Sequence, residues 1–287
     1  MDTIKDDNDK KSFIKKAYRL LIPFFMRKWF YNLRNPEIES PSNWSGNYSS
    51  WEEAMDDCEG YDAEDIFEKV SQASLKVKRG EAAFERDSVL FEKHEYNNDF
   101  LEIIQTISSE HLGNFNVLDF GGSLGSVYFQ YKPILDKLNH VKWNVVEQKH
   151  FVDFGTEKIE SVNLKFYYSI EECQTENKCK VALLSSVISY VQYPFEILQN
   201  LKNYKFEYII IDKTLFSNEV HDHITKQVVP EDIYEASYPC RVFSKKKLIT
   251  FMLKDYDLIK EFDPYNNQVV KVNGTLVEFR CLVFKIK

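Results

Sequence analysis

The stretch VLDFGGSLGSVYFQ, residues 117–130, is the most informative part of this chain for its fold. It contains an apolar run, an acid at Asp119, three glycines and a segment with the pattern of a helix. This succession is typical of the first strand, loop and helix of an open α/β sheet, where ligands bind at the carboxyl ends of the strands. Gly121 and Gly122 can adopt positive φ and let a ligand reach the backbone. The helix beginning near Ser126 would direct its free N–H groups at the same place.

Further apolar runs follow at intervals that suit a parallel sheet. Strands are predicted at 116–120, 141–148, 164–170, 180–188 and 207–214, and two later ones at 257–262 and 277–286. Continuous apolar runs of this length are typical of strands that are covered on both faces. Asn273-Gly274 is a strong hairpin signal, so we expect the terminal strand to be antiparallel to a neighbour. The fold class predicted is therefore α/β.

The first third of the chain has helical patterns instead. Ser50 precedes an apolar-periodic run with early acids, which is a helix start signal, and residues 66–77 carry apolar side chains at helical spacing before Gly80. We expect helix to continue over 81–112, and a linker over the Pro-, Ser- and Asn-rich residues 35–50. Three regions are predicted: 1–45, a basic segment and linker; 46–112, a helical cap; and 113–287, the sheet domain with a substrate-cap insertion at about 213–244.

Composition and charge narrow the function classes. The net charge is −8, yet residues 10–36 hold eight Lys or Arg and no acid, so the remainder carries −8 − 8 = −16. An acidic body of this kind argues against nucleic-acid binding. The basic segment is too short to span a bilayer and lacks a signal-peptide cleavage site. Two interpretations stay open for it: an amphipathic anchor at a membrane surface, or a helix packed on the domain. The five scattered cysteines suit a reducing compartment.

The acid at the end of the second predicted strand adds a second signal. Glu147 lies 22 residues after Gly125, and an acid at that place typically accepts both hydroxyls of a ribose. The loop itself does not have the G-x-G-x-x-G spacing of dinucleotide sites, because position 123 is Ser. It matches hydrophobic-hydrophobic-Asp-hydrophobic-Gly-x-x-x-Gly, and so resembles the first motif of class I S-adenosylmethionine-dependent methyltransferases. Ser123 departs from the middle glycine that this family most often has.

Other stretches strengthen the resemblance. KWNVVEQ, LLSSVISYVQYPFEIL, YIIIDKTLF and IYEASYPCRVF follow in that order, and NYSSWEEA, GYDAEDI and FERDSVLF precede the loop. Together, over about 46–285, they resemble a group of methyltransferases known mainly from genome sequences and often encoded near surface-polysaccharide genes. The resemblance implies a Rossmann-like class I methyltransferase sheet, mostly parallel with an antiparallel last strand, and S-adenosylmethionine as cofactor.

The family's motifs also imply which residues bind the cofactor. The methionine part would be held by the acid and the glycine loop, the ribose by Glu147 with Gln148 beside it, and the adenine would border Ser169 to Glu171. Ser185 and Ser186 would lie beneath the reacting sulfonium, or serve only as strand-end hydrogen-bond partners. The residues so assigned are Asp119, Gly121, Gly122, Ser123, Gly125, Glu147, Gln148, Ser169, Ser185 and Ser186.

The segment after the fifth predicted strand is the candidate acceptor site. Asp212 ends that strand, and His223 is the preferred general base because its ordinary pKa lies near neutral pH; an exposed polar loop is the alternative for His221 and His223. The substrate-binding candidates are Arg86, Gln227, Tyr234, Tyr238 and Arg241. Arg86, in the triplet 85–87, belongs either to a solvated helix face or to a site for an acidic acceptor. No metal is predicted, since His221-Asp222-His223 has no second ligand cluster at suitable spacing.

These features predict a methyltransferase that transfers a methyl group to an oxygen of a small acceptor, such as a sugar of a surface polysaccharide. The expected location is the cytoplasm, with peripheral membrane contact at its inner face if residues 10–36 bind lipid. Two alternatives stay open: an NAD(P)- or nucleotide-sugar-binding Rossmann enzyme, and a non-catalytic cofactor-binding partner in a glycan assembly complex. The sequence does not predict the oligomeric state.

Overall fold

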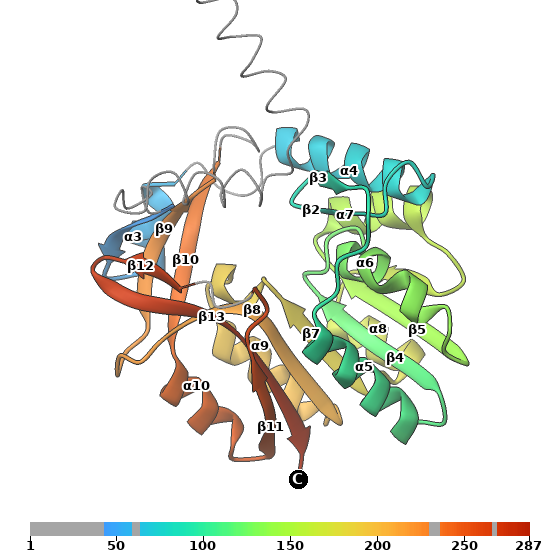
Figure 1. The fold of residues 1–287 in the computed structure, drawn as a ribbon. Coiled ribbons are helices and arrows are strands. Elements are labelled where there is room, and N and C mark those ends of the chain that lie inside the picture. The colour runs from blue at the N-terminus through green and yellow to red at the C-terminus, as the bar shows by residue number, and fades with distance from the viewer. Residues whose placement is uncertain (1–42, 59–63, 230–235, 266–268) are drawn as a thin grey trace, which may run out of the picture. The chain divides into compact units, whose positions relative to one another are not determined.

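The computed structural model describes residues 43–58, 64–229, 236–265 and 269–287, which belong to one compact unit, 43–287 (Figure 1). The basic segment 10–36 and Tyr234 lie outside the described residues. No described helix is long and apolar enough to cross a membrane.

The first half of the unit alternates short strands and helices. Its elements are β1 (Trp44–Tyr48), α3 (Trp51–Asp56), α4 (Glu64–Lys78), β2 (Phe84–Arg86), β3 (Val89–Phe91), α5 (Asn98–Glu110), β4 (Asn114–Phe120), α6 (Ser126–Leu135), β5 (His140–Val146), α7 (Lys149–Phe154) and the π-helical turn η1 (Gly155–Ile159). The second half has β6 (Leu164–Tyr167), α8 (Ile170–Asn177), β7 (Val181–Ser185), the short 3₁₀ helix η2 (Ile188–Tyr190), α9 (Pro194–Asn203), β8 (Tyr208–Ser217), β9 (His223–Val228), β10 (Ser237–Ser244), α10 (Lys245–Met252), β11 (Tyr256–Phe262), β12 (Val269–Val272) and β13 (Thr275–Ile286).

The central sheet confirms the predicted fold class. Strands β6, β5, β4, β7 and β8 lie side by side and are parallel, and β13 pairs antiparallel with β8 and with β11. The predicted Asn273-Gly274 hairpin joins β12 to β13. The sheet is thus mostly parallel with an antiparallel last strand, which is the strand arrangement that the resemblance implies.

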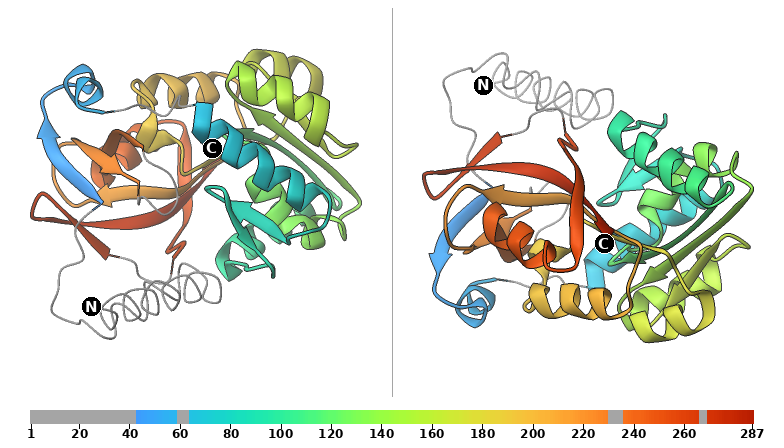
Figure 2. Two further views of the ribbon diagram at one scale, coloured as in Figure 1. Left: turned by 90° about the horizontal axis from the view of Figure 1, so that it is seen from above. Right: turned by 90° about the horizontal axis from the view of Figure 1, so that it is seen from below.

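Both faces of the sheet are covered, as the continuous apolar runs predict. Val117 on β4 belongs to one core cluster, together with residues of α4, α5, α6 and α7. Its neighbour Leu118 belongs to the other cluster, together with residues of α8, α9 and α10. Successive side chains of a strand point to opposite faces, so each strand is buried on both of its faces. Figure 2 shows helices on both sides of the green and yellow strands.

The order in which strands are added to the sheet reverses at β4, and this reversal positions the site. From β4 the chain builds β5 and β6 on one side and then returns to build β7 and β8 on the other. The carboxyl ends of β4 and β7 therefore border a topological switch point, where open α/β sheets bind their ligands. The glycine loop follows β4. Ser185 is the last residue of β7 and Ser186 comes directly after it, so the loop and these two serines all lie at this point.

Two helix predictions have different outcomes. The start signal at Ser50 is confirmed, since its Oγ accepts the Glu53 N–H at 3.1 Å at the beginning of α3. The continuous helix predicted over 81–112 is wrong, because β2 and β3 form a hairpin before α5 begins. Asp87 and Ser88 form its two-residue turn, with φ of 51° and 64°, the left-handed values of a type I′ turn. Asp-Ser tolerates such values less readily than Asn-Gly, so the sequence signal is weak.

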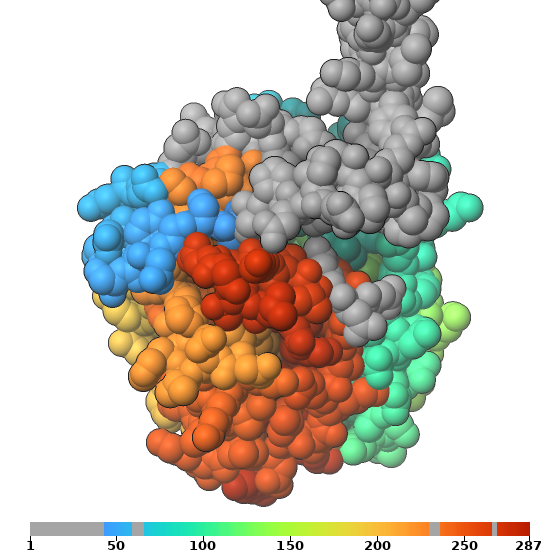
Figure 3. All heavy atoms as spheres, turned by 60° about the vertical axis from the view of Figure 1, so that its left-hand side comes forward, coloured from blue at the N-terminus to red at the C-terminus, as the bar shows by residue number. Residues whose placement is uncertain are grey.

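The linker predicted over 35–50 also needs correction. Trp44–Tyr48 is β1, which pairs antiparallel with β9, and β9 pairs with β10. In the space-filling view, blue atoms of β1 and α3 lie against orange and red atoms of the C-terminal half (Figure 3). Trp44 is buried there against Phe279, with ring centroids 6.1 Å apart. Pairing with a strand some 180 residues away overrides the local Ser- and Asn-rich composition.

Candidate functional site

The glycine loop is held in a tight turn by its own packing. Gly121 has φ +68°, and a Cβ at this position would lie 2.3 Å from Cγ2 of Val187. A Cβ on Gly122 would lie 2.4 Å from the Asp119 carboxylate. The Gly121 N–H donates to the Val146 carbonyl at 2.9 Å, which ties the loop to the end of β5. Side chains are thus excluded from both positions, and the backbone stays open to a ligand.

We expect Gly121→Ala to destabilise the protein by about 2–4 kcal/mol, because left-handed strain of about 1 kcal/mol is added to a clash typical of overpacking. The matched control is Gly80→Ala. Gly80 has φ +78° but nothing within 4 Å of its added Cβ, so it should show the strain alone. Urea unfolding of both variants measures the difference. Equal losses would show that the contact with Val187 does not constrain the loop.

Asp119 lies directly beneath this loop and is fully buried. Its Oδ2 accepts the indole N–H of Trp143 at 2.8 Å, while Oδ1 is buried and has no hydrogen-bond partner among the described residues. Burial raises the pKa of Asp119 to about 7; Trp143 and Lys213 act in the opposite direction, and Glu147 and Asp212 add to the rise. A buried carboxylate oxygen without a donor is costly, so a cationic or N–H group of a ligand would stabilise it.

Glu147 is half-buried at the end of β5 and faces the same loop. Its Oε2 accepts the Gln148 N–H at 2.7 Å and its Oε1 accepts the Ser123 N–H at 3.3 Å. Burial raises the pKa of Glu147, and these two backbone hydrogen bonds oppose the rise. Each oxygen retains acceptor capacity for a ligand hydroxyl. The structure therefore brings Asp119, Glu147 and the glycine loop together at one edge of the sheet.

Most of the other predicted cofactor residues form hydrogen bonds elsewhere in the protein. Ser185 donates its hydroxyl to Oδ2 of Asp212 at 2.8 Å, and the Ser186 N–H donates to the Asp212 carbonyl at 3.0 Å. Ser169 caps α8, where its hydroxyl accepts the Glu172 N–H at 3.1 Å. Gln148 is exposed and precedes the first turn of α7.

The acceptor candidates Asp212, Gln227, Tyr238 and Arg241 lie on β8, β9 and β10. Asp212 is buried at the point where β7 pairs with β8. Tyr190 donates its hydroxyl to Oε1 of Gln227 at 2.7 Å and packs edge-on against Tyr238, with ring centroids 5.2 Å apart. Burial, followed by Cys240, Tyr238, Asp87 and Tyr265, raises the pKa of Tyr190. Tyr190 thus holds a residue of β9 and a residue of β10 together.

Arg241 has a distinct environment. Its guanidinium lies over the Trp51 ring, 5.6 Å from the centroid, and Nη2 donates to the Gln192 carbonyl at 3.2 Å. Its Nε is buried without a partner in the described ranges. Burial lowers the pKa of Arg241, and Asp222 and Cys240 oppose the shift.

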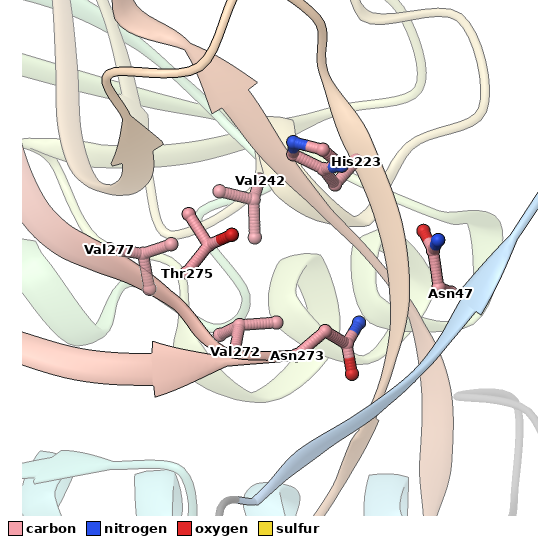
Figure 4. A pocket seen from close by; sticks show the side chains of 7 residues that line it. All are labelled: Asn47, His223, Val242, Val272, Asn273, Thr275 and Val277. Carbon is pink, nitrogen blue, oxygen red and sulfur yellow. The ribbon is translucent and has the colours of Figure 1, made fainter.

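His223 is not brought to this edge of the sheet. It lines a small cavity of about 100 Å³ with Asn47, Val242, Val272, Asn273, Thr275 and Val277 (Figure 4). Neither Asp119 nor Asp212 lines this cavity. Its neighbour Asp222 accepts the Ser244 N–H at 2.9 Å and the Lys247 ammonium at 2.6 Å at the start of α10. Within the part of the chain that the structure describes, no group of His, Cys, Asp and Glu is arranged to hold a metal ion.

The structure adds residues that sequence reasoning missed. Lys213 follows Asp212 directly, and its Nζ lies 3.6 Å from Asp212 Oδ2. Glu85 is only 2% exposed and accepts the hydroxyl of Ser126 at the start of α6, so the solvated-helix interpretation of 85–87 is wrong for it. Burial raises the pKa of Glu85 to about 7. Lys213 could have been found from its place directly after Asp212 in the sequence, but the hairpin that carries Glu85 could not.

Comparisons with known proteins give limited additional information. No protein-family model matches the chain, and no curated protein is similar to it in sequence. Among solved structures, the N-terminal domain of EvdMO1 with SAH and D-fucose is 11% identical, with a TM-score of 0.46, covering 77% of this chain and 97% of that one. An S-adenosylmethionine-dependent methyltransferase from Clostridium acetobutylicum ATCC 824 is 11% identical, with a TM-score of 0.45, covering 77% and 98%. At these values, neither similarity assigns a substrate or a site residue to this chain.

Proposed function

We propose that this protein is an S-adenosylmethionine-dependent methyltransferase that acts on an oxygen of a small acceptor, such as a sugar of a surface polysaccharide. The observation that carries the proposal is the meeting of Asp119, the glycine loop and Glu147 at the switch point of the sheet. The orphaned Oδ1 of Asp119 fits a ligand that brings an ammonium group, and the acid at the end of β5 fits a ribose. A nicotinamide dinucleotide is disfavoured, because the loop lacks the G-x-G-x-x-G spacing.

Different residues of the site fit different parts of the cofactor. Asp119 and the loop Gly121–Gly125 would hold the methionine part, Glu147 the ribose hydroxyls, and the loop from Ser169 would border the adenine. The bound cofactor supplies a methyl group on a positively charged sulfur. The protein has to hold an acceptor oxygen in line with that group and close to it, which is where most of the rate gain arises.

Asp212 is the residue we propose as proton acceptor for the sugar hydroxyl. It lies within β8, opposite Ser185 at the end of β7 and beside Lys213, next to the switch point. A carboxylate can act as general base when it is within hydrogen-bond distance of the proton it removes. His223 stays a prediction for this role; its cavity with Asn47 and Val242 makes it the second choice.

Calorimetry of the full chain with S-adenosylhomocysteine and with NAD⁺ tests the proposal. We expect S-adenosylhomocysteine to bind and, at 100 times its Kd, to stabilise the protein by about 2.7 kcal/mol, while NAD⁺ has no effect. Stabilisation by NAD⁺ alone would contradict the proposal and favour a nucleotide-dependent oxidoreductase. Binding of S-adenosylhomocysteine without methyl transfer to any sugar would favour a non-catalytic partner.

A further inference from the structure

Lys213 is a largely buried cation whose hydrogen-bond donors have no acceptor among the described residues. Its side chain is 13% exposed, and its backbone has φ +49°, a value that is uncommon for lysine. The Asp212 oxygen nearest to its Nζ is 3.6 Å away, beyond the range of an N–H···O hydrogen bond. That oxygen already accepts the Ser185 hydroxyl at 2.8 Å. The ammonium therefore donates to no side chain or carbonyl of the described ranges.

Arg86 is a second cation that has no hydrogen-bond acceptor in the described part of the chain. Its guanidinium lies over the rings of Phe84, Phe91 and Tyr265, at 5.7, 5.5 and 5.9 Å from their centroids. It makes no ion pair or hydrogen bond with another residue in the described part of the chain. Contacts with ring faces orient the guanidinium, and they leave its N–H groups free to bind a carboxylate or phosphate in bidentate geometry.

A chain of contacts places the two cations in one region. Arg86 lies over the Tyr265 ring, and Tyr265 packs edge-on against Phe279 with centroids 5.2 Å apart. Phe279 pairs with Leu215, two residues after Lys213 on β8. Burial lowers the pKa of Lys213; Asp212 opposes this, Arg86 lowers it further, and Asp87 and Asp119 also oppose it. Of the carboxylates that face Lys213, Asp119 is bonded to Trp143 and Asp212 to Ser185, whereas Asp87 is exposed in the hairpin turn. Two positive groups in one region, neither with a hydrogen-bond acceptor among the described residues, would be stabilised by an anion bound between them.

We propose that Arg86 and Lys213 together bind an anionic group of the methyl acceptor, a carboxylate or a phosphate, so that the acceptor is an acidic sugar rather than a neutral one. This inference rests on the proposed function. The pair belongs to the acceptor side because Lys213 directly follows Asp212, the proposed base, within β8. Tyr265, whose ring Arg86 covers, packs against Phe279 of β13, the strand beside β8. The cofactor residues lie instead at the ends of β4 and β5.

Calorimetry with D-glucuronate, D-glucose 1-phosphate and D-glucose tests the inference, on the full chain with and without saturating S-adenosylhomocysteine. We expect at least one acidic probe to bind about 10-fold more tightly than glucose, since hydrogen bonds to charged groups are the strong ones. Lys213→Met and Arg86→Gln should each weaken that binding about 10-fold or more. The matched control is Lys246→Met, because Lys246 is exposed on α10 and should leave all affinities unchanged.

Three results would overturn the inference. In the first, glucose binds as tightly as the acidic probes, or no acidic probe binds at all. In the second, both variants bind the acidic probes like the parent. In the third, both variants bind S-adenosylhomocysteine more weakly than the parent does but bind 5′-methylthioadenosine, which lacks the amino-acid part, equally well. The anion would then be the carboxylate of the cofactor. If the parent binds acidic probes but not S-adenosylhomocysteine, the proposed function fails and the anion site stands.

Discussion

Glu147→Ala will lower the affinity for S-adenosylhomocysteine by about two orders of magnitude or more, and Glu147→Gln by about 10-fold. Hydrogen bonds to a charged group contribute about 1.5–3 kcal/mol each, and we propose that Glu147 accepts two from the ribose. The glutamine keeps one acceptor oxygen, which can still receive the Ser123 N–H that Glu147 accepts at 3.3 Å. Calorimetry at pH 8 measures both affinities.

The control for this prediction is Glu157→Ala. Glu157 is an exposed acid on η1 that pairs only with the adjacent Lys158 in the described part of the chain, so its loss should leave the affinity unchanged. Thermal unfolding of each variant separates lost binding from lost folding. A well-folded Glu147→Ala protein that binds as the parent does would remove the ribose assignment, and with it the strongest support for the cofactor.

Asp119→Asn will have opposite effects on stability and on binding above pH 7. Burial raises the pKa of Asp119 to about 7, so the folded state keeps a proton that the unfolded chain releases near pH 4. The unfolding free energy of the parent therefore falls as the pH rises from about 4 to 7 and levels off above that range. The neutral amide still accepts the Trp143 N–H and escapes this loss, which is on the order of 2–4 kcal/mol.

The measurement is the difference in unfolding free energy between variant and parent at several pH values. We expect the difference to grow in favour of the variant from pH 4 to 7 and then to stay constant. Glu85, whose pKa burial also raises to about 7, contributes the same slope to both proteins and cancels. A variant that is less stable than the parent at pH 8 would show that the ionised carboxylate stabilises the loop.

Binding supplies the second half of this prediction. If Asp119 pairs with the ammonium of the cofactor, the affinity of the parent for S-adenosylhomocysteine should rise with pH through 7 and that of Asp119→Asn should be at least about 10-fold lower at pH 8. Asp136→Asn, which changes an exposed acid that pairs with Lys132, is the control. Equal affinities of variant and parent would place the ammonium elsewhere.

Much of the fold could be predicted because it depends on local patterns. Each of the seven predicted strands matches a strand of the structure within a few residues, since continuous apolar runs leave little choice when both faces are buried. The positions of Asp119 and Glu147 follow from the ends of β4 and β5. Once the strands are parallel and adjacent, their carboxyl ends must lie at one edge, so the candidate cofactor site was within reach of sequence reasoning.

The acceptor side could not be predicted from the sequence, because it is made by contacts between distant segments. Arg86 comes close to Lys213 only because residues 84–91 form a hairpin, and the stacking of Phe84 on Phe91, with centroids 4.4 Å apart, supports that hairpin more than its turn residues do. His223 illustrates the converse: a histidine is a common general base, but β9 turns this one toward Asn47 and Val242. Neither outcome has a signal in local periodicity.

The sequence by itself determined the parallel sheet, its order of strands and helices, and the loop and acids at its carboxyl edge, because burial on both faces and the left-handed glycine backbone are local requirements. Only the tertiary structure decided that Trp44–Tyr48 extends the sheet and that Arg86 and Lys213 share one region. These features depend on which surfaces meet when the chain closes on itself, and pairing across more than 100 residues outweighs the weak preferences of the individual segments.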